Sequence, residues 1–530
     1  MENYERNHAS FNMHKKFKEI TGIGRNKQHG NLKDKNCNII FSTDDKLKRW
    51  QNYIEELFYD NREMIQSRYD LHGPSILKEE VLKDIKDAKD RKACGPDEYT
   101  KELLKVIEEE NISILVTLFN IIYDWGEIPY EWLKSCFITL PKKNNASKCE
   151  DYRTISLMSH TLKLFLKIIH NRIFKKIEEG ISNTQFGFRN GFGTREALFS
   201  LNVMAERCIE MNQDVHVCFI DFEKVRHQKM MDILKKKNID SKEIKLIEFL
   251  YWNQKAKIRV ANKKSEGIEI RRGVRQGCIL SPLLFNMYAE EGFKDIHQVS
   301  AEYGLKMNIN KTKYMISKRN NVNAELRIGN EGIERVNKIK CLGTQFECKA
   351  RSATEIKCRI EQARATFGKL QKLLCGSDIN MALKVRLLKC YIWSALLYGA
   401  EKWSLHKDMQ KRLEACEMWL YRRILKISWS DRISNSEVLR RIGTKKELIN
   451  SIRRRKLEYL GHIMRNKKYQ LLQTILQGKI RGTRAQGRQR VTWLDNIKEW
   501  CNLNSTELFR AVQDKEKLKR MISNFLREEA

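Results

Sequence analysis

The distribution of proline is the feature of this sequence that most constrains its fold. The five prolines are Pro74, Pro96, Pro129, Pro141 and Pro282, and none follows Pro282 in a chain of 530 residues. Proline removes a backbone donor and breaks helix interiors, so a long proline-free stretch can hold uninterrupted helices. The sequence therefore favours a mainly α-helical C-terminal half.

Apolar spacing supports this expectation. In the segments 356–374 and 409–427, apolar residues recur at steps of three and four, which is typical of amphipathic helices. Near the N-terminus, Ser42-Thr43-Asp44-Asp45 resembles a helix start, and it precedes an apolar pattern that begins at Leu47.

The middle of the chain has a different pattern. The run 215–220 is short, β-branched and aromatic, and it predicts a strand buried on both faces. The segments 258–260 and 267–270 predict a hairpin before Arg271. Together with the flanking helical patterns, these segments predict an α+β chain.

The net charge points to a polyanionic partner. The chain has 101 Lys+Arg against 67 Asp+Glu, a formal charge of +34. Residues 451–490 hold 12 Lys+Arg and one acidic residue, which predicts salt-dependent, sequence-tolerant binding of phosphates. The alternatives are a solvated basic surface for the whole chain, and a nuclear-import signal or solvated loop for this segment.

Several classes of protein are not expected. No apolar run reaches the roughly 18 residues of a membrane span, and the N-terminus lacks the apolar core of a signal peptide. We therefore expect an intracellular protein of the nucleus or cytoplasm, neither secreted nor membrane-bound. The fourteen cysteines form no C-x-x-C pair, so we interpret them as small, mostly buried apolar residues rather than zinc ligands.

One carboxylate stands out in the predicted α/β centre. Asp221 follows the predicted strand, where the simplest role of an aspartate is to cap the next helix. About fifty residues later, Gln276-Gly277 forms a glycine-bearing turn in which the backbone can approach a ligand closely. Ser281-Pro282 then opens a further helix.

These residues belong to an ordered series of motifs, and through that series the chain resembles the reverse transcriptase of non-LTR (LINE-type) retrotransposons, from about Leu32 to Trp500. The motifs are Lys92-Ala-Cys-Gly95-Pro96-Asp97, Ile138-Thr-Leu-Pro141-Lys142-Lys143, Asp151-Tyr152-Arg153-Thr-Ile-Ser156-Leu157, Gln185-Phe186-Gly187-Phe188-Arg189 with Gly193-Thr194-Arg195, Phe219-Ile-Asp221-Phe-Glu-Lys224, Arg275-Gln276-Gly277-Cys278, Gly304-Leu-Lys-Met-Asn308-Ile-Asn310-Lys311-Thr312-Lys313 and Lys340-Cys341-Leu342-Gly343.

The resemblance implies an RNA-directed DNA polymerase that acts on an RNA template, a DNA primer and deoxynucleoside triphosphates. Two Mg²⁺ ions about 3.5–4 Å apart would clamp the reacting oxygens, and Asp221 would be a catalytic metal ligand. The predicted nucleotide-binding residues are Lys142, Arg153, Gln276, Gly277 and Lys311. The predicted nucleic-acid-binding residues are Arg189 and Arg195 and, from the basic segment, Arg453, Arg454, Arg455, Arg484 and Arg488. No protein partner is predicted.

The sequence departs from the family at the catalytic centre. The family's Asp-Asp hairpin is expected between Asn286 and Gly304, but the only Asp-Asp pair of the chain is Asp44-Asp45. Glu291 and Asp295 lie in this interval, where they are more typical of the polar face of a helix than of metal ligands. A few residues are also missing after Lys224, where the family continues with Ala-Phe-Asp. We therefore predict little or no polymerase activity, from a decayed or mis-spliced copy.

For the fold, the resemblance implies a right-hand polymerase with α/β fingers and palm, followed by a helical thumb and a basic extension. The predicted domains are an N-terminal helical extension (1–88), the reverse transcriptase domain without its palm hairpin (89–349), and the thumb with the basic region (350–530). Loss of the hairpin is expected to expose a sheet edge and lower stability. Three functions remain in view: an active polymerase, a nucleic-acid-binding remnant, and an unrelated basic helical RNA-binding or scaffolding protein.

Overall fold

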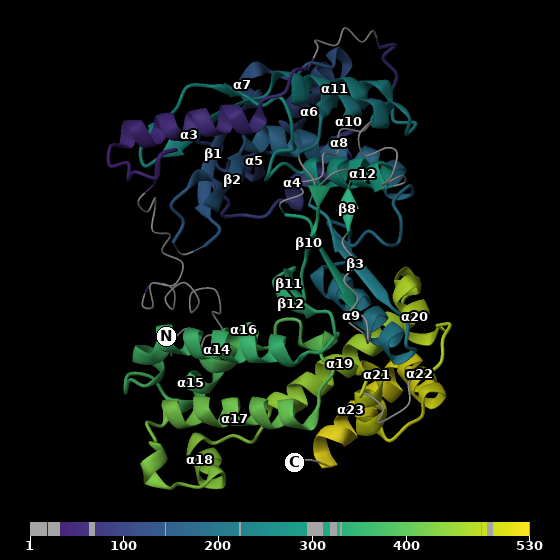
Figure 1. The fold of residues 1–530 in the computed structure, drawn as a ribbon. Coiled ribbons are helices and arrows are strands. Elements are labelled where there is room, and N and C mark those ends of the chain that lie inside the picture. The colour runs from purple at the N-terminus through teal and green to yellow at the C-terminus, as the bar shows by residue number, and fades with distance from the viewer. Residues whose placement is uncertain are drawn as a thin grey trace. The chain divides into compact units, whose positions relative to one another are not determined.

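The computed structural model of the chain forms two compact units, each assembled from separate stretches of sequence. Unit 1 comprises Met1–Arg25, Arg189–Ile220 and Ile309–Ala530, and unit 2 comprises Asn26–Phe188 and Asp221–Asn308. The structure describes residues 19, 32–62, 69–143, 145–221, 224–293, 311–317, 326–328, 331–478, 480–484 and 491–528. Figure 1 shows the chain coloured from its N-terminus to its C-terminus.

Unit 2 contains a mixed sheet with the strand order β2-β1-β4-β5, in which β6 also pairs with β4. Its strands are β1 (Lys134–Pro141), β2 (Tyr152–Leu157), β4 (Lys255–Val260), β5 (Lys263–Lys264) and β6 (Ile268–Glu269). The predicted hairpin before Arg271 is confirmed, because β4 pairs antiparallel with both β5 and β6. One face of the sheet packs against α3 (Thr43–Phe58) through Trp50, Ile54 and Phe58.

The helices of unit 2 share an apolar core of their own. They are α4 (Lys78–Lys86), α5 (Lys101–Val106), α6 (Ile112–Trp125), α7 (Tyr130–Leu133), α8 (His160–Glu178), α10 (His227–Lys235), α11 (Ser241–Asn253) and α12 (Ser281–Phe293). The helix start predicted at Ser42 is confirmed for α3, because the Ser42 hydroxyl accepts from the amides of Asp44 and Asp45. The Asp44 carboxylate pairs with Lys263, at 2.7 Å, so this Asp-Asp pair serves a helix end.

Unit 1 contains a small sheet with the order β10-β7-β3. Its strands are β3 (Val215–Phe219), β7 (Lys313–Ser317) and β10 (Glu334–Arg335), and shorter pairs are formed by β8 (Arg327–Ile328) with β9 (Glu331–Gly332) and by β11 (Lys338–Cys341) with β12 (Thr344–Glu347). The strand predicted at 215–220 is confirmed, but its burial on both faces was wrong. Among the described residues, β3 pairs only with β7, and its side chains His216 and Cys218 are exposed.

The remainder of unit 1 is helical, as the proline-free sequence predicts. The helices are α9 (Thr194–Glu210), α14 (Ala353–Leu374), α15 (Met381–Leu387), α16 (Ser394–Leu396), α17 (Lys407–Ile424), α18 (Asn435–Ile442), α19 (Leu448–Arg465), α20 (Gln470–Gln477), α21 (Trp493–Cys501), α22 (Ser505–Gln513) and α23 (Lys515–Glu528). The periodic segment 356–374 is confirmed as part of α14, and the segment 409–427 is confirmed as helical up to Ile424, where α17 ends. Phe199 of α9 lies against Tyr459 and Trp493, in a core shared with α19 and α21.

The predicted α+β class is confirmed. All fourteen cysteines are free, but the expectation that most are buried was wrong, because only Cys136, Cys149, Cys278 and Cys416 are fully buried. A short, polarizable side chain tolerates partial exposure, so cysteine content alone does not predict burial. Within the described ranges, no helix is long and apolar enough to cross a membrane.

Candidate functional site

The β1–β2 hairpin of unit 2 carries two of the predicted nucleotide-binding residues at the end where a loop connects its strands. Leu140 pairs with Arg153 in the antiparallel register, and the Lys142 amide donates to Asp151 O at 2.8 Å. Both Lys142 and Arg153 are exposed. The Lys142 ammonium donates to Glu150 O at 2.8 Å, so its charge is held at this end of the hairpin. The strand pairing therefore brings two cations, eleven positions apart in sequence, to one edge of the sheet.

The Gln276–Gly277 turn lies against the same hairpin. The Ser156 amide of β2 donates to Gln276 O at 2.8 Å. Gly277 has φ of +113°, and a Cβ there would lie 2.8 Å from Ser156 O, so the glycine is required by the close approach to β2. The sequence correctly predicts a close backbone approach, but in unit 2 this approach is to a strand. Arg153 lies three residues before Ser156, or about 10 Å along the strand.

The buried Arg275 holds the Gln276–Gly277 turn in place through hydrogen bonds. The Arg275 guanidinium donates to Gln254 Oε1 at 2.5 Å and to Leu133 O at 2.9 Å. Burial lowers the pKa of Arg275. Arg275 thus joins α7, the start of β4 and the Gln276–Gly277 turn, and it positions the turn rather than reaching solvent.

Arg62 and His227 form a further set of contacts, here called the Arg62–His227 clamp, which the sequence did not predict. His227 is fully buried, its Nε2 donates to Gly273 O at 2.7 Å, and its Nδ1 accepts from Arg62 at 2.6 Å. Burial lowers the pKa of His227 to about 3, so the ring is neutral near pH 7. Arg62 also donates to the carbonyls of Tyr251 and Trp252. The clamp holds the segment before Arg275 against α10 and α11, and no local sequence signal predicts a contact between residues so far apart.

Lys224, three residues after Asp221, is also held in unit 2. Its ammonium lies 3.2 Å from the centre of the Phe58 ring and donates to Leu57 O at 3.3 Å. Burial, with the charges of Arg272 and Lys142, lowers the pKa of Lys224 to about 6. Because Lys142 contributes to this shift, Lys224 lies within electrostatic reach of that cation of the hairpin.

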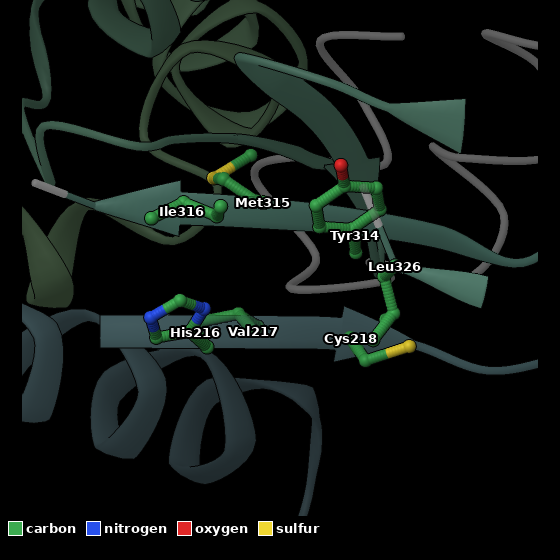
Figure 2. A pocket seen from close by; sticks show the side chains of 7 residues that line it. All are labelled: His216, Val217, Cys218, Tyr314, Met315, Ile316 and Leu326. Carbon is green, nitrogen blue, oxygen red and sulfur yellow. The ribbon is translucent and has the colours of Figure 1, made fainter. Parts of the chain in front are cut away.

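The strand before Asp221 belongs to the β3–β7 sheet of unit 1. Phe219 pairs with Lys313, so the chain leaves β3 and enters β7 at the same end of the sheet. Asp221 follows Phe219 by two positions, Lys311 precedes Lys313 by two, and both are exposed. Figure 2 shows the apolar pocket on this sheet, which is lined by His216, Val217, Cys218, Tyr314, Met315, Ile316 and Leu326. The pocket offers no carboxylate to a metal ion.

The metal-ligand set implied by the family does not assemble in the part of the chain that the structure describes. No group of three or more His, Cys, Asp or Glu side chains there is arranged to hold a metal ion. Glu291 pairs with Lys237 at 2.9 Å, so this possible substitute ligand is engaged on α12. Asp295 and Glu223 lie outside the described residues. A two-metal clamp therefore does not fit the residues that the structure describes.

The Gln185–Arg189 motif is divided between the two units. In unit 2, Gln185 donates to Asn286 Oδ1 at 3.1 Å, and Asn286 donates to Gly187 O at 2.9 Å. In unit 1, the Arg189 guanidinium lies 5.3 Å from the centre of the Phe192 ring. The Asn286 contacts connect α12, which follows the Gln276–Gly277 turn, to this motif.

The predicted basic residues of the C-terminal region differ in exposure. Arg454 and Arg455 are exposed on α19, Arg453 is half-buried over Trp500, and the neighbouring Lys456 is fully buried. Lys456 donates to Trp403 O at 2.8 Å and to Asn496 Oδ1 at 3.2 Å, and burial lowers its pKa to about 7.

Two further predicted arginines have partners within unit 1. Arg195 lies 4.4 Å from the centre of the Tyr459 ring and pairs with Glu196, while Arg484 pairs with Glu210 at 2.9 Å. Arg488 lies outside the described residues. Much of the positive charge in this region is therefore engaged by aromatic rings and carboxylates of the fold.

Residues 140–300 match the family model described as reverse transcriptase (RNA-dependent DNA polymerase). The chain carries a reverse transcriptase domain. This domain contains the hairpin cations, Asp221 and the Gln276–Gly277 turn, and the match supports the polymerase-type fold that the motifs imply.

Homologues of the chain include RNA-directed DNA polymerases of non-LTR retrotransposons. The Pol polyprotein of the type-1 retrotransposable element R2 from Nasonia vitripennis is 30% identical over 215 residues, covering 40% of this chain and 20% of the relative. The polymerase of the mobile element jockey from Drosophila melanogaster is 26% identical over 251 residues, covering 45% and 27%.

The probable RNA-directed DNA polymerase of the transposon X-element from Drosophila melanogaster is 24% identical over 406 residues, covering 66% of this chain and 44% of the relative. The chain thus spans less than half the length of each of these relatives. Among solved structures, telomerase from Candida albicans in complex with a TWJ fragment of telomeric RNA aligns with 72% of this chain and 70% of its own, at 11% identity and a TM-score of 0.27.

Proposed function

We propose that this chain binds RNA template and DNA primer through its reverse transcriptase domain but has little or no polymerase activity. The observation that carries this proposal is the sequence between Asn286 and Gly304, which lacks an Asp-Asp pair. Reverse transcriptases generally use a divalent metal ion, and the active relatives' chemistry would require Mg²⁺ at Asp221 and at further carboxylates. The described residues supply no such carboxylate cluster, so they do not support the metal-dependent step.

The binding half of the proposal rests on residues that remain exposed. Lys142 and Arg153 lie at the end of the hairpin, and Gln276 and Gly277 are exposed beside β2. Arginine suits bidentate contact with phosphate, and lysine acts as a compact charge. We propose that these residues of unit 2 contact the nucleotide or the nucleic acid backbone. We propose that Lys311, Arg189, Arg454 and Arg455, which belong to unit 1, also contact nucleic acid. We also propose that the protein is located inside the cell, in the nucleus or the cytoplasm.

The proposal is tested by pairing a binding assay with a primer-extension assay on the same substrate. The full chain is mixed with an RNA template annealed to a labelled DNA primer, the four deoxynucleoside triphosphates, and either Mg²⁺ or Mn²⁺. We expect the hybrid to bind, with no extension above the background of an Asp221→Ala variant. Extension by the wild type that Asp221→Ala abolishes would overturn the prediction of inactivity. Absence of binding at low salt would overturn the proposed function itself.

A further inference from the structure

The turn between α17 and α18 presents a tryptophan to solvent. Trp429 begins a short 3-10 helix, Trp429–Asp431, and its side chain is 92% exposed, more than any other large apolar residue that the structure describes. Tryptophan contributes more apolar area than any other side chain, so a fold that leaves it uncovered forgoes a large gain from burial. A single residue so exposed is consistent with contact to a partner.

The backbone that carries Trp429 is fixed by several hydrogen bonds. The Ser428 amide donates to Asp431 Oδ2 at 2.7 Å, and the Ser430 hydroxyl donates to Ser428 Oγ at 2.8 Å. From α17, Arg422 donates to Ile433 O at 2.6 Å, which fastens the end of the turn to the helix. An aromatic ring on a backbone so restrained loses less conformational entropy when it binds.

The surroundings of Trp429 indicate the chemistry of the partner. Ser428 and Ser430 flank it on either side, and the exposed cations Lys426 and Arg432 lie three residues before and after it. Both cations occupy left-handed backbone positions, with φ of +58° and +49°, at the bends on either side of the turn. The one carboxylate inside the turn, that of Asp431, is engaged by the Ser428 amide.

An apolar protein surface would favour further apolar side chains around a central tryptophan. A single-stranded nucleic acid instead requires an exposed ring for an unstacked base and cations for the adjacent phosphates. The turn supplies the second combination. We propose that Trp429 is a stacking platform for one base of a single-stranded RNA, with Lys426 and Arg432 contacting its backbone. This inference rests on the proposed function, because it assumes that the chain binds RNA.

The inference is tested by fluorescence anisotropy of the full chain with a labelled 12-nucleotide single-stranded RNA. Trp429→Ala should weaken binding about tenfold, Trp429→Leu should weaken it equally, and Trp429→Phe should weaken it less than about threefold, because only phenylalanine retains a ring for stacking. The slope of log affinity against log salt should stay unchanged in all three. The double change Lys426→Gln with Arg432→Gln should reduce that slope by about 1.4, because each phosphate that a cation neutralises contributes about 0.7.

Trp125 provides a matched control in unit 2. It is 69% exposed, but the cations near it are engaged within the fold, because Lys242 pairs with Asp124 at 2.7 Å and Lys245 donates to Trp125 O at 2.6 Å. We therefore expect Trp125→Ala to leave RNA affinity unchanged. A thermal melt of each variant confirms that an equal amount of folded protein is compared.

The possible outcomes separate this inference from the proposed function. If the wild type binds the RNA and Trp429→Ala binds equally well, the stacking platform is wrong and the proposed function stands. If Trp429→Leu binds as well as Trp429→Phe, the contact is apolar and does not depend on ring stacking. That result would overturn the inference and would favour contact of Trp429 with an apolar protein surface. If the wild type fails to bind any RNA, the proposed function fails as well.

Discussion

The hairpin end of unit 2 and helix α19 of unit 1 are both basic in sequence, but they use their charge differently. Lys142 and Arg153 are both exposed at the hairpin end, whereas on α19 Arg454 is exposed and Lys456, two positions later, is fully buried. Two positions correspond to about 200° around a helix, so the two side chains leave α19 on opposite faces. A count of basic residues therefore overstates the charge available to a partner in the helical unit.

The largest expected effect comes from removing the buried amino group of Lys456. Lys456→Met retains most of the side-chain volume but leaves the hydrogen-bond acceptors Trp403 O and Asn496 Oδ1 unsatisfied. We expect the free energy of unfolding to fall by about 3 kcal/mol, measured by urea denaturation. The control Arg454→Met removes a surface ion pair with Glu458 and should cost less than about 0.5 kcal/mol. Equal effects of the two changes would contradict the difference between the two faces of α19.

A smaller loss is expected at the turn beside the hairpin. Gly277→Ala forces a side chain onto a left-handed residue and against Ser156 O, so we expect unfolding to become easier by about 2 kcal/mol. The control is Gly368→Ala in the interior of α14, where an added Cβ meets nothing within 4 Å. That change should stabilise the protein by about 0.5–1 kcal/mol. A neutral Gly277→Ala would show that the turn does not approach β2 closely.

The exposed cations of the hairpin should matter for binding rather than for stability. The double change Lys142→Ala with Arg153→Ala should weaken binding of an RNA–DNA hybrid about tenfold at low salt, and should lower the salt slope by about 1.4–1.8. Arg484→Ala is the matched change in unit 1, and its pairing with Glu210 should limit its effect to about twofold. If Arg484→Ala has the larger effect, the charge of the helical unit is more available than its ion pair indicates.

The smallest expected effect is a dependence of stability on pH that arises from Lys224. The pKa of Lys224 is about 6 in the folded state, below the value of about 10.4 for an unfolded chain. Between these values the unfolded state holds a proton that the folded state lacks, so stability rises with pH, by about 1 kcal/mol from pH 6 to 7. Lys224→Met should remove this rise in urea denaturation at the two pH values. The control Lys257→Met changes an exposed lysine of β4 and should retain it.

The sequence predicts local structure well in this chain. Helices α14 and α17 follow from apolar spacing, the start of α3 from its cap, and strand β3 from its β-branched run, because each signal depends on neighbours in sequence. The exposed face and the half-buried face of β3 could not be predicted in this way, because burial depends on what the folded chain packs against each face. The roles of Lys456, Arg62 and His227 depend on distant contacts for the same reason.

In the candidate site too, some features follow from the sequence and others depend on distant contacts. Motif order predicts Lys142, Arg153 and the Gln276–Gly277 turn as site residues. In the structure Lys142 and Arg153 lie at the loop end of the β1–β2 hairpin, and the turn contacts Ser156 of β2. The positions of the domain boundaries at 88 and 349, and the roles of the individual site residues, stay predictions. The clamp formed by Arg62 and His227 had no sequence signal, because its members match no spacing rule and lie in separate helical and loop segments.

The assembly of unit 1 from separate stretches has a consequence for how the chain folds during synthesis. Glu206 of α9 accepts a hydrogen bond from the Trp493 amide, across 287 positions of sequence. At about 5–20 residues per second, a ribosome needs tens of seconds to make the intervening chain. During that interval Phe199 and its apolar neighbours on α9 lack these partners, so the nascent protein exposes apolar surface of the kind that promotes aggregation. A chain truncated before α21 would lack Trp493, and this part of the contact surface of α9 would stay uncovered.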